Sequence, residues 1–492
     1  MTGFDITIRG GTAANDAETF RADIGIVADK IVAVEPNLAP GRRDIDATGR
    51  YVLPGGIDTH CHVEQLSGMG RMTADDWYSA SVSAAFGGTT MIVPFAAQHR
   101  GKSLKTVAAE YAALAAEKAV IDYSYHVILT ETDDVTLRED LPALIRSGIT
   151  SFKVYMTYDA LKLDDYQMLE VLAVAAREKA LCMVHAENTD VIRWISKRLL
   201  EQGFGAPKHH GVSHVHLAEG EATHRVIQLS RLFEVPILIV HVSAREAVGA
   251  IQMARQAGLQ VFGETCAHYL VLTAENMDLP GTEGAKYCCS PPLRDKAAQD
   301  ALWKALKTGA LQVLSSDHAP YRYDETGKLP YGQATTFKDV ANGMPSLEAR
   351  LPLLFSEGVN KGRLTVPEFV ALSAANHARM YGMYPRKGVL AAGADADVAI
   401  WNPDKQVTLS TDILHDRAGY TPFDGMTVKG WPETVLSAGR VVVEGGRLNA
   451  ARGSGRFIPR GVPEAQATDR EISTEAAFFR SLADAKRTQD LT

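Results

Sequence analysis

Short apolar runs recur along the central part of the chain, and each is followed by a stretch with the composition of a helix. These runs are residues 56–62, 89–95, 123–129, 151–156, 182–187, 236–243, 260–266 and 312–317. The intervening stretches, such as residues 103–119, are rich in Ala, Leu, Lys and Glu, which are strong helix formers. Eight strand-then-helix units over ~330 residues predict an α/β fold, a (β/α)8 TIM barrel over residues 56–387.

The two ends of the chain have a different pattern. Apolar and polar residues alternate at 5–9 and 22–35, and strand-like runs return at 397–401 and 441–443, bounded by glycines. We therefore expect one small β-sandwich domain built from both ends, residues 1–55 and 388–460. The remaining residues, 461–492, are polar with a helical stretch around 474–486, and we expect a C-terminal tail that either contacts a neighbouring subunit or is frayed.

Composition narrows the class of protein. The 492 residues are too many for one ordinary domain, and 46% hydrophobic with 22% charged residues is typical of a soluble globular protein. The net charge of -8 comes without long charged runs, so we expect no nucleic-acid partner. The N-terminus lacks the pattern of a signal peptide, and no apolar run approaches the ~18 residues of a membrane span. The 5 cysteines show no zinc-finger or disulfide spacing, which indicates the cytoplasm.

The sequence GGIDTHCH at positions 55–62 carries the first candidate chemistry. Residues two apart on a strand face the same side, so His60 and His62 would point together into the barrel. Both imidazoles could bind one metal ion there. Taken alone, the same pattern also fits two histidines on a polar strand face.

Four further residues strengthen the metal hypothesis. His185, His241 and Asp317 lie at or near the ends of expected strands, at the face where TIM-barrel active sites lie. Lys153 lies inside an apolar run, where an unpaired ammonium is costly. Carbamylation by carbon dioxide would turn Lys153 into an anion that bridges two cations; the alternative is a lysine whose amine reaches the barrel mouth.

Four histidines, a bridging anion and an aspartate suit two divalent metal ions, with Zn²⁺ as the default. Such a pair can activate a bridging hydroxide and polarise a carbonyl, which is hydrolysis of an amide or ester. Asp317 would be a ligand and also the proton shuttle.

Other histidines and cysteines are expected elsewhere. We expect His318 and His268 to orient the ligands. Cys61 should point away from the site, and Cys288 and Cys289 should be packing residues. Four histidines fall between helices and are expected to face solvent or a partner: His209, His210, His214 and His216.

The chain resembles the cyclic amidohydrolases, in the dihydropyrimidinase and hydantoinase branch, from about Asp5 to Arg460. The motifs that carry the resemblance are GGIDTHCH at 55, SFKVYMTY at 151, VHAEN at 184, HVSA at 241, CSPPLR at 289 and SSDHAPY at 315. The resemblance implies metal-dependent ring opening of hydantoins or 5,6-dihydropyrimidines by a homotetramer.

The resemblance also implies roles for single residues. A more buried metal would be held by His60, His62, Lys153 and Asp317. The carbamate on Lys153 would bridge to a second metal held by His185 and His241. Tyr158 would stabilise the oxyanion, and the backbone groups of Ser290 and Asn342 would grip the ring amide.

Two departures leave the substrate open. Residues 63–65 read Val-Glu-Gln and residues 94–98 read Pro-Phe-Ala-Ala-Gln, where much of the family differs. Both stretches lie near the expected barrel mouth. Allantoinase, dihydroorotase and cyclic imide hydrolase therefore remain alternatives, although we identify no arginine anchor of the kind that the first two generally use. A non-catalytic scaffold is a remote alternative, because such relatives lose metal ligands and this chain keeps all six.

Overall fold

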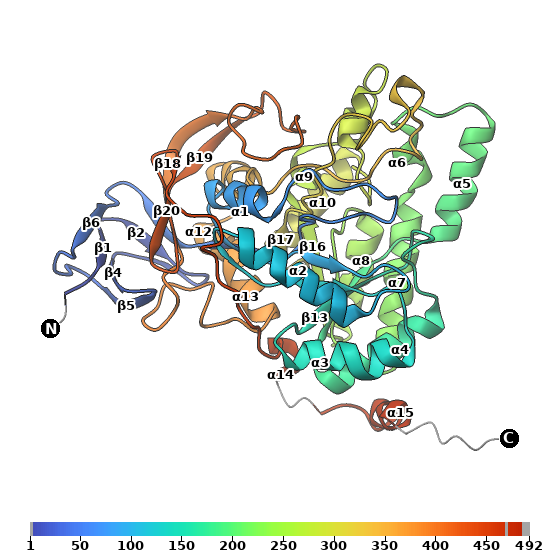
Figure 1. The fold of residues 1–492 in the computed structure, drawn as a ribbon, viewed down its shortest axis with the longest axis horizontal. Coiled ribbons are helices and arrows are strands. Elements are labelled where there is room, and N and C mark those ends of the chain that lie inside the picture. Colours follow the sequence, from blue (N-terminus) through green and yellow to red (C-terminus); the bar gives the residue numbers. More distant parts are fainter. Residues whose placement is uncertain (1–2, 468–470, 485–492) are drawn as a thin grey trace.

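The computed structural model describes residues 3–467 and 471–484. A barrel of strands surrounded by helices forms its larger part, and a β-rich part formed by the two ends of the chain lies at one side (Figure 1). This arrangement confirms the fold class expected from the sequence.

Parallel strands line the barrel and pair in two hydrogen-bonded groups, one of three strands and one of seven. Their bounds are β8 Gly56–Asp58, β9 Thr89–Ile92, β10 Phe95–Ala97, β11 Asp122–Tyr123, β12 His126–Ile128, β13 Ser151–Tyr155, β14 Leu181–His185, β15 Ile237–Ile239, β16 Val261–Cys266 and β17 Val313–Ser315. The second and third expected runs each form two short strands, and Pro94, which has no N–H for the ladder, lies between β9 and β10.

The last barrel strand returns to the first. A parallel bridge pairs Cys61 with His318, and the His62 amide donates to the His318 carbonyl at 2.7 Å. The Asp317 amide donates to the His60 carbonyl at 2.9 Å. This closure brings residues far apart in the sequence to one end of the barrel.

Helices cover the outside of the barrel, and polar caps start several of them. Asp76 accepts from the Ser79 amide at the start of α1, and Ser103 caps α2. The bounds are α1 Trp77–Phe86, α2 Leu104–Lys118, α3 Leu141–Arg146, α4 Asp165–Glu178, α5 Thr189–Glu201, α6 His209–Ser213, α7 His216–Arg231, α8 Arg245–Gln256, α9 Ala267–Val271, α10 Lys296–Lys307, α11 Arg350–Leu354, α12 Val366–Val370 and α13 Asn376–Met380.

Strand alternation separates two apolar layers. Phe152 and Val154 of β13 belong to the larger core cluster, which includes residues of the surrounding helices, whereas Tyr155 belongs to the cluster of the barrel interior. Lys153 is two residues from Tyr155 on the same strand, so its side chain also faces the barrel interior. Cys61 belongs to the larger cluster, in agreement with the expectation that it points away from the site.

Strands from both chain ends pair in the β-rich part. One sheet has the order β5-β4-β1-β6 and the other β21-β20-β19-β18-β7-β2-β3. Their bounds are β1 Ile6–Arg9, β2 Thr12–Ala14, β3 Thr19–Phe20, β4 Asp23–Val27, β5 Lys30–Glu35, β6 Arg43–Asp46, β7 Tyr51–Pro54, β18 Val398–Thr408, β19 Thr427–Ser437, β20 Arg440–Glu444 and β21 Arg447–Leu448. The register of Leu53 with Ala399 joins the two ends. The exact domain limits stay a prediction.

A buried group of charges connects the two parts. The Lys387 ammonium lies 2.5 Å from carboxylate oxygens of Asp122, which is in β11, and of Asp397, which precedes β18. It also lies 3.0 Å from Asp395. Arg456 adds a second cation, 2.8 Å from Asp122. These pairs balance one another in a place where single charges would be costly.

The expected C-terminal tail is described only in part, because residues 468–470 and 485–492 lie outside the described residues. Its helices are α14 Glu464–Ala467 and α15 Thr474–Asp484. The Arg480 guanidinium donates to the Phe233 carbonyl at 2.8 Å, so α15 contacts its own chain, while Phe478 and Leu482 are exposed. Within the described ranges, no helix is both long and apolar enough to cross a membrane.

Candidate active site

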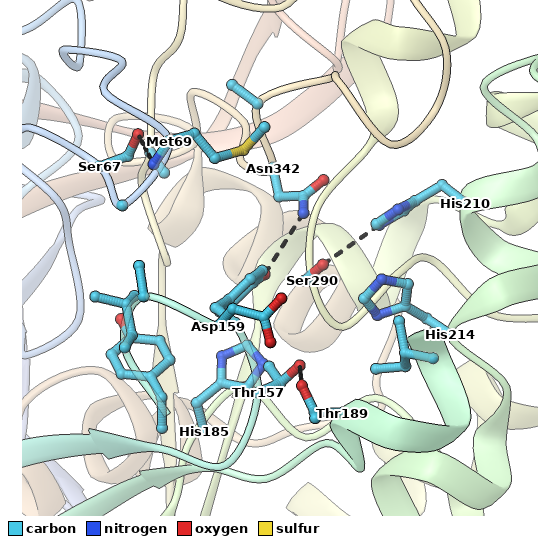
Figure 2. A pocket seen from close by; sticks show the side chains of 18 of the residues that line it. Ser67, Met69, Thr157, Asp159, His185, Thr189, His210, His214, Ser290 and Asn342 are labelled. Carbon is cyan, nitrogen blue, oxygen red and sulfur yellow. Dashed lines mark hydrogen bonds between the residues drawn. The ribbon is translucent and has the colours of Figure 1, made fainter. Parts of the chain in front are cut away.

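A cavity of about 400 Å³ opens at the carboxyl ends of the barrel strands (Figure 2). Its lining brings together most of the residues singled out in the sequence, namely His62, Lys153, Tyr158, His185, His241, Ser290, Asp317 and Asn342. His60 is fully buried and does not line the cavity, but it contacts two residues that do, Lys153 and Asp317.

Three acceptor atoms meet where His60, His62 and Asp317 come together. The Asp317 Oδ1 atom lies 3.2 Å from His60 Nε2 and 3.3 Å from His62 Nε2. His60 Nδ1 donates to Glu264 at 2.5 Å and His62 Nδ1 donates to the Gln65 amide oxygen at 2.8 Å. With neutral rings, both Nε2 atoms then present lone pairs toward the carboxylate. Such a set of acceptors fits a divalent cation.

His185 and His241 form a second group beside it. His241 Nε2 lies 2.9 Å from His185 Nδ1, and His241 Nδ1 is buried without a hydrogen-bond partner in the described residues. His185 Nε2 donates to Glu187 at 2.7 Å, which leaves Nδ1 as the atom with the lone pair. Burial, His185 and Lys153 hold the pKa of His241 well below its usual range, so the ring is neutral and able to bind a metal.

The Lys153 amine lies between the two histidine groups. Its Nζ atom is 2.8 Å from His60 Nε2 and lies over the rings of Phe95 and Tyr155. No ion pair joins it to a carboxylate within the described part of the chain. Burial lowers the pKa of Lys153 to about 8, against the opposing effect of Asp317.

Asp317 is ionised in this setting. Burial alone would raise the pKa of its carboxyl group, but His60, His62 and His241 hold that pKa well below its usual range. A carboxylate in contact with two imidazoles can bind a cation and can also accept a proton.

Strained backbone conformations occur at three of these positions. Tyr158, His241 and Asp317 have φ angles of 68°, 41° and 46°. Side chains other than glycine adopt this region at a cost of order 1–3 kcal/mol, and such residues cluster at functional sites. The surrounding fold thus holds all three side chains toward the cavity.

Tyr158 lies on the cavity wall with Ser290 and Asn342. Its hydroxyl accepts from Asn342 Nδ2 at 3.5 Å, and Figure 2 shows Ser290 and Asn342 on this wall. Burial raises the pKa of Tyr158 above its usual range, so the phenol is a hydrogen-bond donor at neutral pH. Asn342 Oδ1 is buried without a hydrogen-bond partner in the described residues.

The expectation for the histidine cluster is wrong for two of its members. His210 and His214 are buried, line the cavity, and lie with ring centroids 4.4 Å apart (Figure 2). His214 Nδ1 lies 2.8 Å from Glu187, the same carboxylate that holds His185. The packing of α6 against the barrel mouth, which local sequence does not indicate, removes both rings from solvent.

Sequence reasoning also missed the residues that orient the candidate ligands. Glu264, Gln65 and Glu187 hold His60, His62 and His185, whereas His318 contacts Asp75 at 2.9 Å. Both ring nitrogens of His268 lack partners in the described residues. Glu187 offered a signal, because it stands two positions after His185. Glu264 offered a weaker one, its place on the seventh expected strand.

Comparison with known proteins agrees with this geometry. The model of the amidohydrolase family matches residues 51–442. The chain belongs to the amidohydrolase family. This membership, together with the acceptor cluster, supports the use of divalent metal.

Individual members of the family are similar over nearly the full length. A D-hydantoinase from Ralstonia pickettii is 40% identical over 457 residues, 93% of this chain and 99% of the relative. A D-hydantoinase from Geobacillus stearothermophilus is 42% identical, over 94% and 98%. The crystal structure of a dihydropyrimidinase from Brevibacillus agri superposes with a TM-score of 0.90 at 41% identity, over 93% and 98% of the two chains.

Proposed function

We propose that this amidohydrolase opens the ring of a cyclic amide of the hydantoin or 5,6-dihydropyrimidine type. The observation that carries the proposal is the convergence of His60, His62 and Asp317 beside His185 and His241 at the cavity. The relatives named for hydantoins and dihydropyrimidines, similar over almost their whole length, support the substrate class.

His60, His62 and Asp317 would hold one metal ion, and His185 and His241 a second. When bound, two divalent ions, with Zn²⁺ as the expected identity, supply an activated water and polarise the ring carbonyl. Glu264, Gln65 and Glu187 keep the imidazoles in the orientation and tautomer that this requires.

Lys153 would carry the carbamate that joins the two metal groups. Only the neutral amine can attack carbon dioxide, and a pKa of about 8 makes that form accessible near neutral pH. The modification replaces a buried ammonium by an anion with two oxygens, which suits a site between histidine groups. A metal-loaded crystal with an unmodified amine at Lys153 would contradict this assignment.

Asp317 would take the proton of the attacking water and deliver it to the ring nitrogen that leaves. Tyr158 would donate its hydroxyl hydrogen to the carbonyl oxygen as negative charge develops there. Ser290 and Asn342, on the same wall, would hold the ring amide through their backbone groups.

The decisive experiment measures ring opening by the purified protein supplied with zinc and bicarbonate. The rings are dihydrouracil, hydantoin, 5-phenylhydantoin, allantoin, dihydroorotate and a cyclic imide, and the products are quantified by chromatography. We expect turnover within the first three rings, its loss in Lys153→Ala, and its retention in Lys102→Ala, an exposed lysine.

The other outcomes select the alternatives. Turnover confined to allantoin, dihydroorotate or the imide would keep the metal chemistry and change the substrate. No turnover of any ring by the metal-loaded protein would favour a scaffold.

We also propose that the enzyme is a cytoplasmic homotetramer. Light scattering of the purified protein tests the assembly, and a monomer at micromolar concentration would contradict it. Fractionation of the source cells tests the location.

A further inference from the structure

One buried lysine behind the cavity wall meets no carboxylate. Lys328 is 0% exposed, and its Nζ atom donates to the carbonyl oxygens of Cys288 and Ala341, each at 3.0 Å. Within the described ranges, no ion pair involves its ammonium. The Lys328 side chain therefore places an uncompensated positive charge in the interior.

Both carbonyls belong to segments that line the cavity. Cys288 stands two residues before Ser290, and Ala341 directly precedes Asn342. The Gly343 amide donates to the same Cys288 carbonyl at 3.0 Å. One ammonium thus connects two cavity-lining segments that are separated by about fifty residues in the sequence.

The loop that carries Lys328 is itself tightly held. The Lys328 amide donates to the Arg322 carbonyl at 2.9 Å and the Leu329 amide to the Asp324 carbonyl at 2.9 Å. A Cβ atom on Gly327 would lie 2.1 Å from the Arg322 oxygen, so only glycine fits there. The backbone around Lys328 is therefore held in one conformation, from which the side chain reaches the two carbonyls.

This arrangement differs from that of a lysine with a purely structural role. Lys387, also buried, lies among Asp122, Asp395 and Asp397. Burial lowers the pKa of Lys328 to about 8, in keeping with the cost of an isolated charge. An apolar side chain of similar length would avoid that cost but would remove the donor to the Cys288 and Ala341 carbonyls, so the ammonium is present for these two segments.

We propose that Lys328 is a positioning residue for the substrate, one that holds the Ser290 and Asn342 segments in a single geometry and polarises the peptide between Ala341 and Asn342. This inference rests on the proposed function. The carbonyl oxygen that accepts from the ammonium and the N–H of Asn342 belong to the same peptide group. A cation on the oxygen strengthens that N–H as a donor to a ring carbonyl.

The test compares Lys328→Met with Lys387→Met under steady-state conditions, on the ring that the wild type opens fastest. A hydrogen bond to a part of the ring whose charge does not change during the reaction stabilises the bound ground state and the transition state equally. We therefore expect KM to rise by about tenfold to one hundredfold in Lys328→Met, with kcat within about threefold and zinc content unchanged. Lys387→Met should lower stability and leave KM unchanged.

A second variant keeps the proposal testable if Lys328→Met fails to fold. Lys328→Ala leaves space for a small amine, so propylammonium should lower its KM in a concentration-dependent way. Propanol, which is similar in size and uncharged, should not.

Some results would overturn the proposal. Unchanged KM in Lys328→Met would do so, as would equal effects of propylammonium and propanol on Lys328→Ala. A wild type that opens no ring would remove the proposed function and this inference together, whereas an active wild type with an unaffected Lys328→Met would remove only this inference.

Discussion

Glu264 offers a direct test of how the proposed metal ligands are oriented. Its Oε1 atom accepts from His60 Nδ1 at 2.5 Å and from the His241 amide at 3.0 Å, and its Oε2 atom accepts from Ser315 at 2.7 Å. Burial alone would raise the pKa of Glu264, but His60, Ser315 and His241 lower it, so the group is a carboxylate. Glu264→Gln keeps the shape and one acceptor oxygen for His60 and the His241 amide, and it replaces the oxygen that faces Ser315 by an NH2 group, from which the Ser315 hydroxyl can accept. The change that bears on His60 is the loss of the negative charge.

The magnitude follows from that one change. A hydrogen bond to a charged group contributes ~1.5–3 kcal/mol, and a charge-assisted bond is roughly twice as strong as a neutral one. Glu264→Gln should therefore cost about 1–1.5 kcal/mol of metal binding through His60, which is about a tenfold weaker affinity for zinc. This figure lies at the lower end of the effect typical of residues that orient metal ligands.

The assay is a titration of the metal-free protein with zinc in competition with a chromophoric chelator at neutral pH. Glu348→Gln is the matched control, because Glu348 is also buried and accepts from His415 at 3.1 Å instead of from a candidate ligand. The control should lose stability and keep its zinc affinity. If Glu264→Gln binds zinc as tightly as the wild type does, the orienting role assigned to Glu264 is refuted.

Four further outcomes are expected. Tyr158→Phe should lower kcat by about a hundredfold to a thousandfold with zinc content unchanged, because the oxyanion loses one donor; an unchanged kcat in steady-state assays would exclude that role. Removal of metal by a chelator should abolish activity and lower the free energy of unfolding. The loss should be about 4 kcal/mol, compared with the protein in free zinc at ~1,000 times Kd. Added zinc should restore both the activity and the free energy of unfolding. Lys387→Met should cost about 3–5 kcal/mol in urea unfolding, because it leaves buried carboxylates unpaired. Finally, burial alone would raise the pKa of Asp395, but Lys387 and Lys30 lower it to about 2. The contribution of Asp395 to stability is therefore present above the ordinary pKa near 3.8 and is lost as the pH falls through about 2. Unfolding measured at a series of acid pH values should show this loss in the wild type and less of it in Asp395→Asn.

The candidate ligand residues were predictable because each one is marked by local chemistry. His60 and His62 share one strand face, and Lys153 stands out as a charged side chain in an apolar run. The residues that orient them were harder to predict, because the contact of Glu264 with His60 spans 204 positions. No periodicity within a strand contains that information.

The burial of two histidines on the cavity wall was also not predictable from local sequence. His210 and His214 follow one another at helical spacing in a polar segment, which indicates solvent exposure. The structure buries both of them because α6 lies across the barrel mouth, where His214 reaches Glu187. Burial of a polar helix depends on what packs against it, and that partner lies elsewhere in the chain.

By itself, the sequence determined the alternation of strands and helices, the β-rich ends and the chemistry of the candidate ligand set, because these depend on neighbouring residues and on side-chain type. Only the tertiary structure decided which carboxylate holds which imidazole, that two histidines line the cavity, and that the Lys328 ammonium joins the Ser290 and Asn342 segments. The physical reason is barrel closure. Closing the barrel brings the carboxyl ends of distant strands to one place, and the contacts made there depend on the packing of the whole chain.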